Sequence, residues 1–282
     1  MPVLTRDQQN QTVQKTQKVK TSKDASNKTV ELLDLQLVFD QQSIQNNTSC
    51  SHPHYLFSPM HYEPKYAYPL LVWLHHIGSD EREVLRIMPH ISLRNYAAVA
   101  PRGTAVAEPI PDLSNDLSVA AILNRPKTYY GWTDCPEGFD EAEQRIFDCI
   151  AVAKERCNIA DRKIFIAGFG VGGAMALRIA LQFPDRFAGA ASFGIDGTLP
   201  TNTNVLSRWL ESRNLSILLG MGANTSECGE NGNKTLRHQS ETMELIYTSG
   251  MNIDINEYPN IQSLMPEMLQ DLNRWMMQIV CR

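Results

Sequence analysis

The stretch RKIFIAGFGVGGAMALRIAL, residues 162–181, constrains the fold of this chain more than any other. Residues 164–168 form a short run in which every residue is either apolar or small, and this predicts a buried strand. Three glycines follow that allow the backbone to turn sharply: Gly170, Gly172 and Gly173. Apolar residues then recur at helical spacing: Met175, Ala176, Ile179 and Ala180. The stretch therefore predicts a strand that turns abruptly into a helix at Gly170.

The rest of the chain alternates strand-like and helix-like segments, which predicts an α/β fold with a mainly parallel central sheet and helices on both faces. We expect strands at residues 30–40, 54–60, 68–76, 96–103, 188–195, 215–223 and 254–259. We expect helices at residues 80–95, 139–159, 203–213, 238–251 and 263–280. Asp80 is the expected N-cap of the first helix, and Pro89 is expected to bend it.

Residues 1–28 are polar and poor in large apolar side chains, so we expect a disordered tail. Residues 29–282 are expected to form a single α/β domain. Residues 104–138 form a long irregular segment rich in proline. Loops of this length inside a compact domain are usually functional.

Composition and charge narrow the function classes. The net charge is −5 and no basic block lies outside the N-terminal tail, so we expect no nucleic-acid partner. No apolar run reaches the roughly 18 residues of a membrane span, and the N-terminus lacks the apolar core of a signal peptide. We therefore expect a cytoplasmic protein. Six cysteines form no CxxC pair, which predicts free thiols, no metal site and no cofactor: Cys50, Cys135, Cys149, Cys157, Cys228 and Cys281.

From about residue 54 to 280 the chain resembles the carboxylesterase/phospholipase-like branch of the α/β-hydrolase superfamily. The resemblance is carried by YPLLVWLHHIGSDE, by AVAPRG, by IFIAGFGVGG with LQFPDRFAGAASFG, and by YPNIQSLMPEMLQDLNRWMM. It implies the α/β-hydrolase fold, and it makes the sharp turn at Gly170 the equivalent of the nucleophile elbow. It also implies descent from enzymes that hydrolyse carboxylic esters.

The family's chemistry needs serine, aspartate and histidine in that order along the chain. The resemblance places Gly170 at the serine position, Asn224 (in GANTS) at the acid position and Gln262 (in YPNIQ) at the histidine position. Glycine cannot attack a carbonyl, asparagine carries no charge, and glutamine does not titrate near neutral pH. Three replacements in one chain predict a degenerate, non-catalytic member.

Ligands of open α/β sheets bind above the carboxyl ends of the strands. We expect four residues to line this pocket: His76, Ile77, Trp132 and Val171. The family carries glycine-rich residues after the first histidine of HHIG, so His76 and Ile77 are expected to fill part of the oxyanion hole. The expected partner is either a small acyl or aromatic ligand or another protein, and the sequence does not separate the two.

Two other functions remain open at this point. Residual hydrolysis would have to use residues outside the triad positions, for which the sequence offers His75, His76, Asp134, Cys135 and Asp196. Gly168, Gly170 and Gly173 also fit the G-x-G-x-x-G fingerprint of dinucleotide-binding proteins, with Asp196 about twenty residues further on. That fingerprint normally opens its domain, whereas several strand–helix units precede it here.

Overall fold

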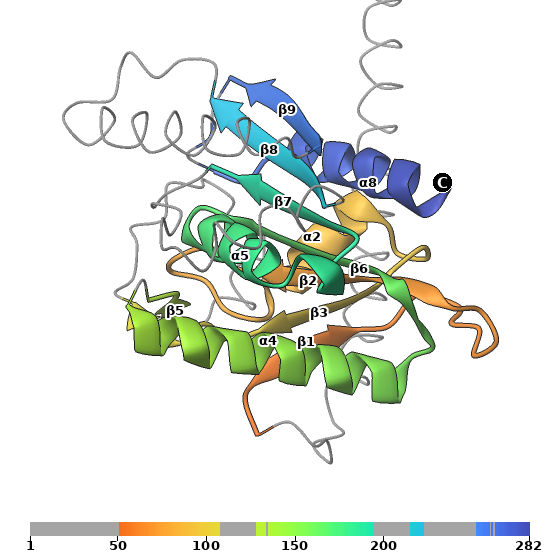
Figure 1. The fold of residues 1–282 in the computed structure, drawn as a ribbon, viewed down its shortest axis with the longest axis horizontal. Coiled ribbons are helices and arrows are strands. Elements are labelled where there is room, and N and C mark those ends of the chain that lie inside the picture. The colour runs from red at the N-terminus through yellow and green to blue at the C-terminus, as the bar shows by residue number, and fades with distance from the viewer. Residues whose placement is uncertain are drawn as a thin grey trace, which may run out of the picture. The chain divides into compact units, whose positions relative to one another are not determined.

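A seven-stranded sheet forms the centre of the protein (Figure 1). The computed structural model describes residues 51–107, 128–133, 135–194, 215–222, 252–259, 261 and 263–282. All of them belong to one compact unit of the chain, made of residues 46–116 and 125–282. The expected tail, the strand at 30–40 and the helices at 203–213 and 238–251 lie outside the described residues.

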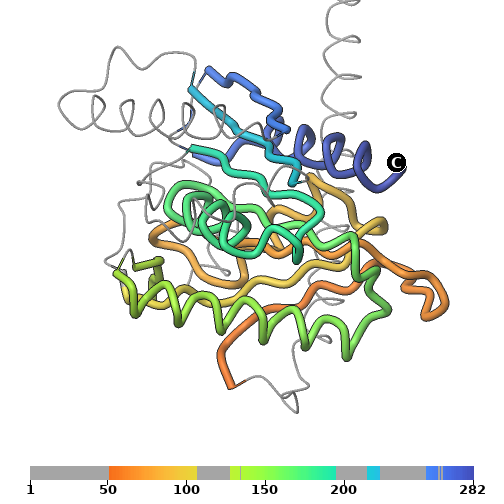
Figure 2. The backbone as a smooth tube through the Cα atoms, viewed as in Figure 1, coloured from red at the N-terminus to blue at the C-terminus, as the bar shows by residue number. Residues whose placement is uncertain are grey.

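The strands follow the order β1-β3-β2-β6-β7-β8-β9. Only β1 is antiparallel to its neighbour, and the other five pairings are parallel. This arrangement confirms the α/β class with a mainly parallel sheet. The strands are β1 (His54–Phe57), β2 (Tyr68–Leu74), β3 (Ala97–Pro101), β6 (Ile159–Phe169), β7 (Gly189–Phe193), β8 (Ser216–Gly222) and β9 (Asn252–Tyr258). Figure 2 shows the same sheet as a backbone trace, with β1 at one edge and β9 at the other.

Continuous apolar sequence explains the buried strands. Every residue of β2 and of β3 is buried, as expected of strands covered on both faces. Successive side chains point to opposite faces, so Leu70, Val72 and Leu74 of β2 join one core while Leu71 and Trp73 face the other way.

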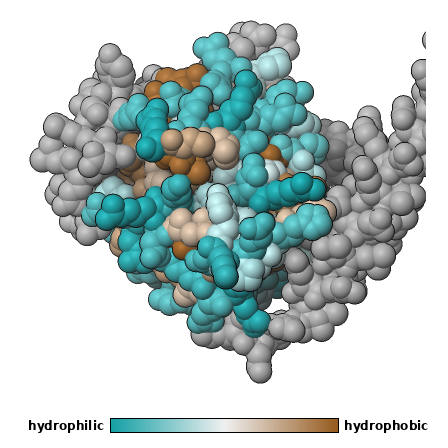
Figure 3. Space-filling view, turned by 90° about the vertical axis from the view of Figure 1, so that its right-hand side faces the viewer, coloured by the Kyte–Doolittle hydropathy of each residue, from teal (hydrophilic) through white to brown (hydrophobic). Residues whose placement is uncertain are grey.

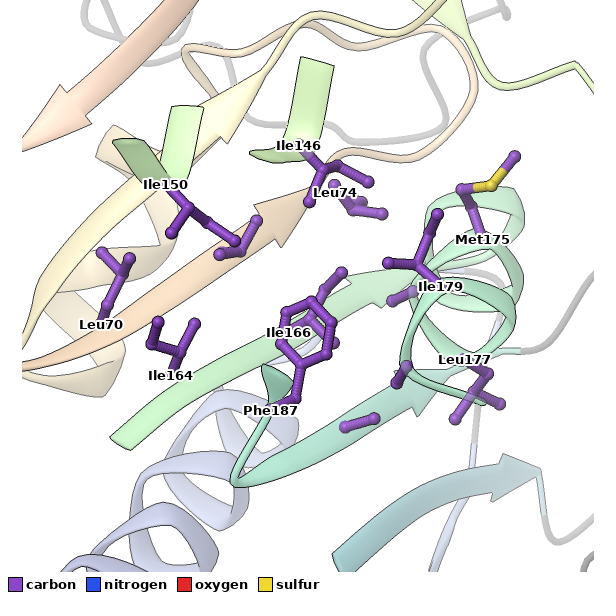
Figure 4. Close-up of a cluster of buried hydrophobic side chains, with 14 of the residues drawn as sticks. Leu70, Leu74, Ile146, Ile150, Ile164, Ile166, Met175, Leu177, Ile179 and Phe187 are labelled. Carbon is purple, nitrogen blue, oxygen red and sulfur yellow. The ribbon is translucent and has the colours of Figure 1, made fainter. Parts of the chain in front are cut away.

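Helices cover both faces of the sheet. Helices α4 and α5 contact β3, β6 and β7 and build the core shown in Figure 4. In that core Ile150 of α4 lies on the side of Leu70, and Ile146 lies beside Leu74. Helices α2 and α8 contact each other and pack on the other face, where the ring of Trp275 lies edge-on to Phe165. These helices are α2 (Glu83–Ile91), α4 (Pro136–Arg156), α5 (Val171–Gln182) and α8 (Pro266–Val280).

The first turn of α2 differs from the sequence expectation. The helix begins at Glu83 with Arg82 in the N-cap position, so the prediction of Asp80 as N-cap is wrong. The Asp80 carboxylate instead accepts the backbone N–H of Arg82 and binds the Arg82 guanidinium at 2.8 Å. This local pairing holds residues 80–82 in a turn. The helix then continues past Pro89 to its end at Ile91.

The long segment 104–138 contains a two-stranded sheet, β4 (Ala105–Ala107) with β5 (Tyr129–Gly131), and the start of α4. Residues 108–127 lie outside the described part. The four described cysteines are free thiols, as expected, and Cys149 and Cys157 are buried.

The face seen from the right of Figure 1 is mostly hydrophilic, with hydrophobic residues in small patches (Figure 3). No helix in the described ranges is long and apolar enough to cross a membrane.

Candidate active site

The predicted sharp turn at Gly170 is confirmed, between β6 and α5. Gly170 has φ +56° and ψ −126°, a conformation that residues with a side chain rarely adopt. Its N–H donates to the carbonyl of Phe193 at 2.8 Å, and its carbonyl accepts the N–H of Ala174 at 3.0 Å. One hydrogen bond thus fixes the turn to β7 and the other to the first turn of α5.

The neighbouring glycines let helix α5 pack directly on strand ends. A Cβ atom on Gly172 would lie 2.3 Å from the Leu74 carbonyl oxygen and 2.4 Å from the His75 carbonyl oxygen. A Cβ atom on Gly168 would lie 2.6 Å from the same Leu74 oxygen. In this structure the glycine pattern therefore serves the close approach of strand and helix.

Space is open directly above Gly170. Among the described residues, a Cβ atom built there has two neighbours within 4 Å, the carbonyl oxygen of Gly194 and Cβ of His76, both at 3.9 Å. A β-carbon at this position would therefore meet no close contact with the described residues. The site thus has the backbone and the room for a nucleophile but carries none at residue 170.

The loop after β9 reaches the same edge of the sheet. A Cβ atom on Gly194, at the end of β7, would lie 3.1 Å from the Ile261 carbonyl oxygen. A Cβ atom on Gly222, the last residue of β8, would lie 3.1 Å from the Ile261 side chain. The residue before Gln262 therefore lies over the carboxyl ends of β7 and β8, beside the elbow.

Several residues singled out from the sequence lie outside the described part: Asn224, Gln262, Asp134 and Asp196. Their assignment to the site stays a prediction. Val171 begins α5 directly after the elbow, where the first N–H groups of a helix have no partner within the helix.

His75 holds the loops of the site together. Its Nδ1 donates to the His76 carbonyl at 2.9 Å, and its Nε2 accepts the N–H of Gly103 at 2.9 Å. The indole N–H of Trp132 donates to the His75 carbonyl at 2.8 Å. His75 is fully buried, and burial lowers its pKa, which favours the neutral ring that this bonding needs. His75 and Trp132 are thus buried and fix β2 to the loop after β3.

His76 forms a pair that the sequence reasoning missed. Its Nδ1 lies 3.1 Å from Oε2 of Glu83, the first residue of α2, and Trp73 donates its indole N–H to Oε1 at 3.2 Å. The Glu83 side chain is only 4% exposed, whereas that of His76 is 37% exposed. The sequence did carry one signal of this pair: Glu83, an acidic residue at the expected start of a helix, follows His76, a histidine at the end of a strand, by seven positions.

Glu83 is ionised despite its burial. Burial on its own raises the pKa of this carboxyl, but the hydrogen bond and the charge of His76, with Arg86 and Ser79, more than offset it. The resulting pKa is about 2. The site therefore holds a buried carboxylate behind a half-exposed imidazole, next to the open space above Gly170.

Cys135 is the N-cap of α4, and its Sγ accepts the Gly138 N–H at 3.4 Å. No described histidine is bonded to this sulfur. Hydroxyl oxygens cap helices better than most side chains do. We therefore expect the Cys135→Ser variant to be more stable than the Cys135→Ala variant by about 0.5–1 kcal/mol. Urea unfolding of the two variants measures the difference. Equal midpoints would contradict the capping role.

Among the described residues, no group of three or more His, Cys, Asp or Glu side chains could hold a metal ion.

Comparisons with known proteins agree with this geometry. The phospholipase/carboxylesterase family model matches residues 130–279. The chain is similar to the Bacillus cereus carboxylesterase structure, with 14% identity over 82% of this chain and 96% of that one and a TM-score of 0.55. A Mesorhizobium loti carboxylesterase gives 15% identity, 82% and 96% coverage and a TM-score of 0.56. The structure of YahD with malic acid gives 14% identity over 81% of this chain and 99% of that one, with a TM-score of 0.54.

These identities establish a shared fold with the solved structures and no more. No curated protein sequence matches the chain significantly. The family model, by contrast, covers more than half of the 282 residues and includes the elbow and the strands that follow it. The protein therefore belongs to the phospholipase/carboxylesterase family of α/β-hydrolases.

Proposed function

We propose that this protein is a non-catalytic member of its family that binds a small ligand in the former active-site pocket. The observation that carries the proposal is the geometry at Gly170. The turn keeps the strained conformation and the free space of a nucleophile elbow, while the residue has no side chain. Serine hydrolysis without a nucleophile has no covalent route.

Glycine at this position also changes the energetics of the fold. A side chain held at such a φ and ψ costs about 1–3 kcal/mol of backbone strain. Glycine adopts the conformation with little penalty. Loss of the serine thus relieves strain, and this gain fits a protein that no longer hydrolyses esters. The glutamine and asparagine at the other two triad positions support the same conclusion.

A small ligand, acyl or aromatic, is the occupant that we propose. The open space above Gly170 lies beside His76, and Ile77 is 42% exposed next to it in the chain. The carboxyl ends of parallel strands are the usual ligand site in such sheets. YahD, which shares the fold, was solved with malic acid, a molecule of this size.

Hydrolysis of p-nitrophenyl butyrate and labelling by a fluorophosphonate probe test the proposal. We expect the parent protein to show no turnover above the buffer rate and no labelling, because no serine occupies the elbow. Gly170→Ser and Cys135→Ala are assayed alongside. We expect p-nitrophenyl butyrate to raise the melting temperature of the parent, by an amount equivalent to about 2.7 kcal/mol at 100 times its Kd.

Turnover by the parent that disappears in Cys135→Ala would contradict the proposal and place the chemistry at the start of α4. Turnover that survives in Cys135→Ala would also contradict it and favour residual hydrolysis by other residues. Absence of both turnover and a melting shift would exclude the acyl-ligand pocket and leave a protein-interaction role to be tested.

A further inference from the structure

The His76–Glu83 pair lies outside the family's triad positions and makes the pocket chemically selective. Glu83 is ionised, so both of its carboxylate oxygens can only accept hydrogen bonds. The Nδ1 atom of His76, 3.1 Å from Oε2, must therefore carry the hydrogen. This fixes the ring's second nitrogen, Nε2, as the atom that is left for a ligand.

The surroundings hold the ring in place. Trp73 and Arg86 also approach the Glu83 carboxylate, at 3.2 Å and 3.9 Å. The Phe169 ring lies edge-on to the imidazole with 5.9 Å between centroids. In the part of the chain that the structure describes, His76 Nε2 has no hydrogen-bond partner. Since the His76 Cβ borders the space above Gly170, the imidazole is a neighbour of whatever fills that space.

The carboxylate behind the ring decides which ligand fits best. With Nδ1–H bonded to Glu83, Nε2 offers a lone pair, so the group that binds it must bring a proton. Arg86 also faces Glu83, and Asp80 and the buried His75 lie close to the pair. A carboxylic acid brings such a proton, and the resulting contact between imidazole and carboxylate is a charge-assisted hydrogen bond, about twice as strong as a neutral one. An ester offers no proton, and the N–H of an amide makes only a neutral hydrogen bond.

We propose that His76, held by Glu83, binds the ligand of this pocket, and that this ligand carries a carboxyl group on a short apolar acyl or aryl body. The inference rests on the proposed function and names its ligand class. The apolar body follows from Phe169 beside the imidazole and from the exposed Ile77 next to it. The preferred ligand is thus the acid that ester hydrolysis would release, and the ester is expected to bind more weakly.

Isothermal titration calorimetry with benzoate and benzamide tests the inference, because the two probes differ only in the carboxylate. At pH 8 benzoate should bind 10- to 100-fold more tightly than benzamide, as expected for about one charge-assisted hydrogen bond. Titrations in two buffers of different ionisation enthalpy should show uptake of a proton with benzoate and none with benzamide.

The variants separate the pair from the rest of the protein. His76→Ala should lose the 10- to 100-fold preference for benzoate. Glu83→Gln, which keeps the shape of the side chain, should weaken benzoate binding and abolish the proton uptake. His90→Ala changes an exposed histidine of α2 and should bind like the parent. Circular dichroism spectra confirm that each variant is folded.

Three results would overturn the inference. Equal benzoate affinity in the parent and in His76→Ala would remove His76 from the site. Benzamide binding as tightly as benzoate would exclude the carboxyl group, while leaving the proposed ligand pocket in place. Binding of neither probe would overturn the inference, and p-nitrophenyl butyrate then decides the pocket itself: a melting shift with that ester keeps the proposed function, and no shift removes it as well.

Discussion

Gly172→Ala is expected to destabilise the protein by about 3 kcal/mol, near the upper end of what overpacking costs. The added methyl group would lie 2.3 Å and 2.4 Å from the carbonyl oxygens of Leu74 and His75. Both obstacles are backbone atoms at the end of β2, so no rotamer change relieves them. Either α5 or the end of β2 has to move, and β2 pairs with both β3 and β6. The midpoint of urea unfolding measures the loss.

Gly170→Ala is the matched control, two residues away in the same turn. Its methyl group meets none of the described residues closer than 3.9 Å, so we expect backbone strain at φ +56° to be the main cost. We expect a loss of about 1–2 kcal/mol, smaller than that of Gly172→Ala. If the two variants unfold at the same urea concentration, the close approach of α5 to β2 does not limit the substitution at residue 172.

The sequence predicted the central elements well because their signals are local. The apolar run at residues 68–76 became the fully buried β2, and the strand, glycine turn and helix at 162–181 became β6, Gly170 and α5. The periodic face of the helix expected at 139–159 is buried in α4, which begins three residues earlier at Pro136. Helix ends depend on capping contacts of single residues, and this explains the errors at Pro136 and Asp80.

The His76–Glu83 pair was not predicted because it depends on tertiary structure. His76 follows a strand and Glu83 begins a helix, and their contact depends on the turn that the Asp80–Arg82 interaction closes. Trp73, the buried residue before the last residue of β2, donates the second hydrogen bond to the Glu83 carboxylate. None of these relations has a fixed spacing in sequence. The triad positions, by contrast, came from the resemblance, and of these the described structure reaches only Gly170.

Glu83 is expected to make the protein sensitive to acid. Its pKa falls from 4.5, the ordinary value, to about 2 in the folded protein. A carboxyl group whose pKa is lowered by folding contributes stability above its unfolded pKa and loses it as the pH falls towards the folded pKa. The difference corresponds to about 3 kcal/mol, present at pH 7 and lost between about pH 5 and pH 2.

Glu83→Gln isolates this contribution from those of the other carboxyl groups. The variant should be less stable than the parent by about 3 kcal/mol at pH 7, and the two should converge near pH 2, where Glu83 is itself protonated. Urea unfolding at a series of pH values measures both curves.

Glu137→Gln, at an exposed position in the first turn of α4, should follow the parent within the few tenths to about 1 kcal/mol expected from the helix dipole. A constant difference between parent and Glu83→Gln from pH 7 to pH 2 would mean that the carboxylate charge is not what stabilises the pair. The imidazole of His76 would then be held by shape and hydrogen bonding alone, and the charge would no longer support its preference for an acidic ligand.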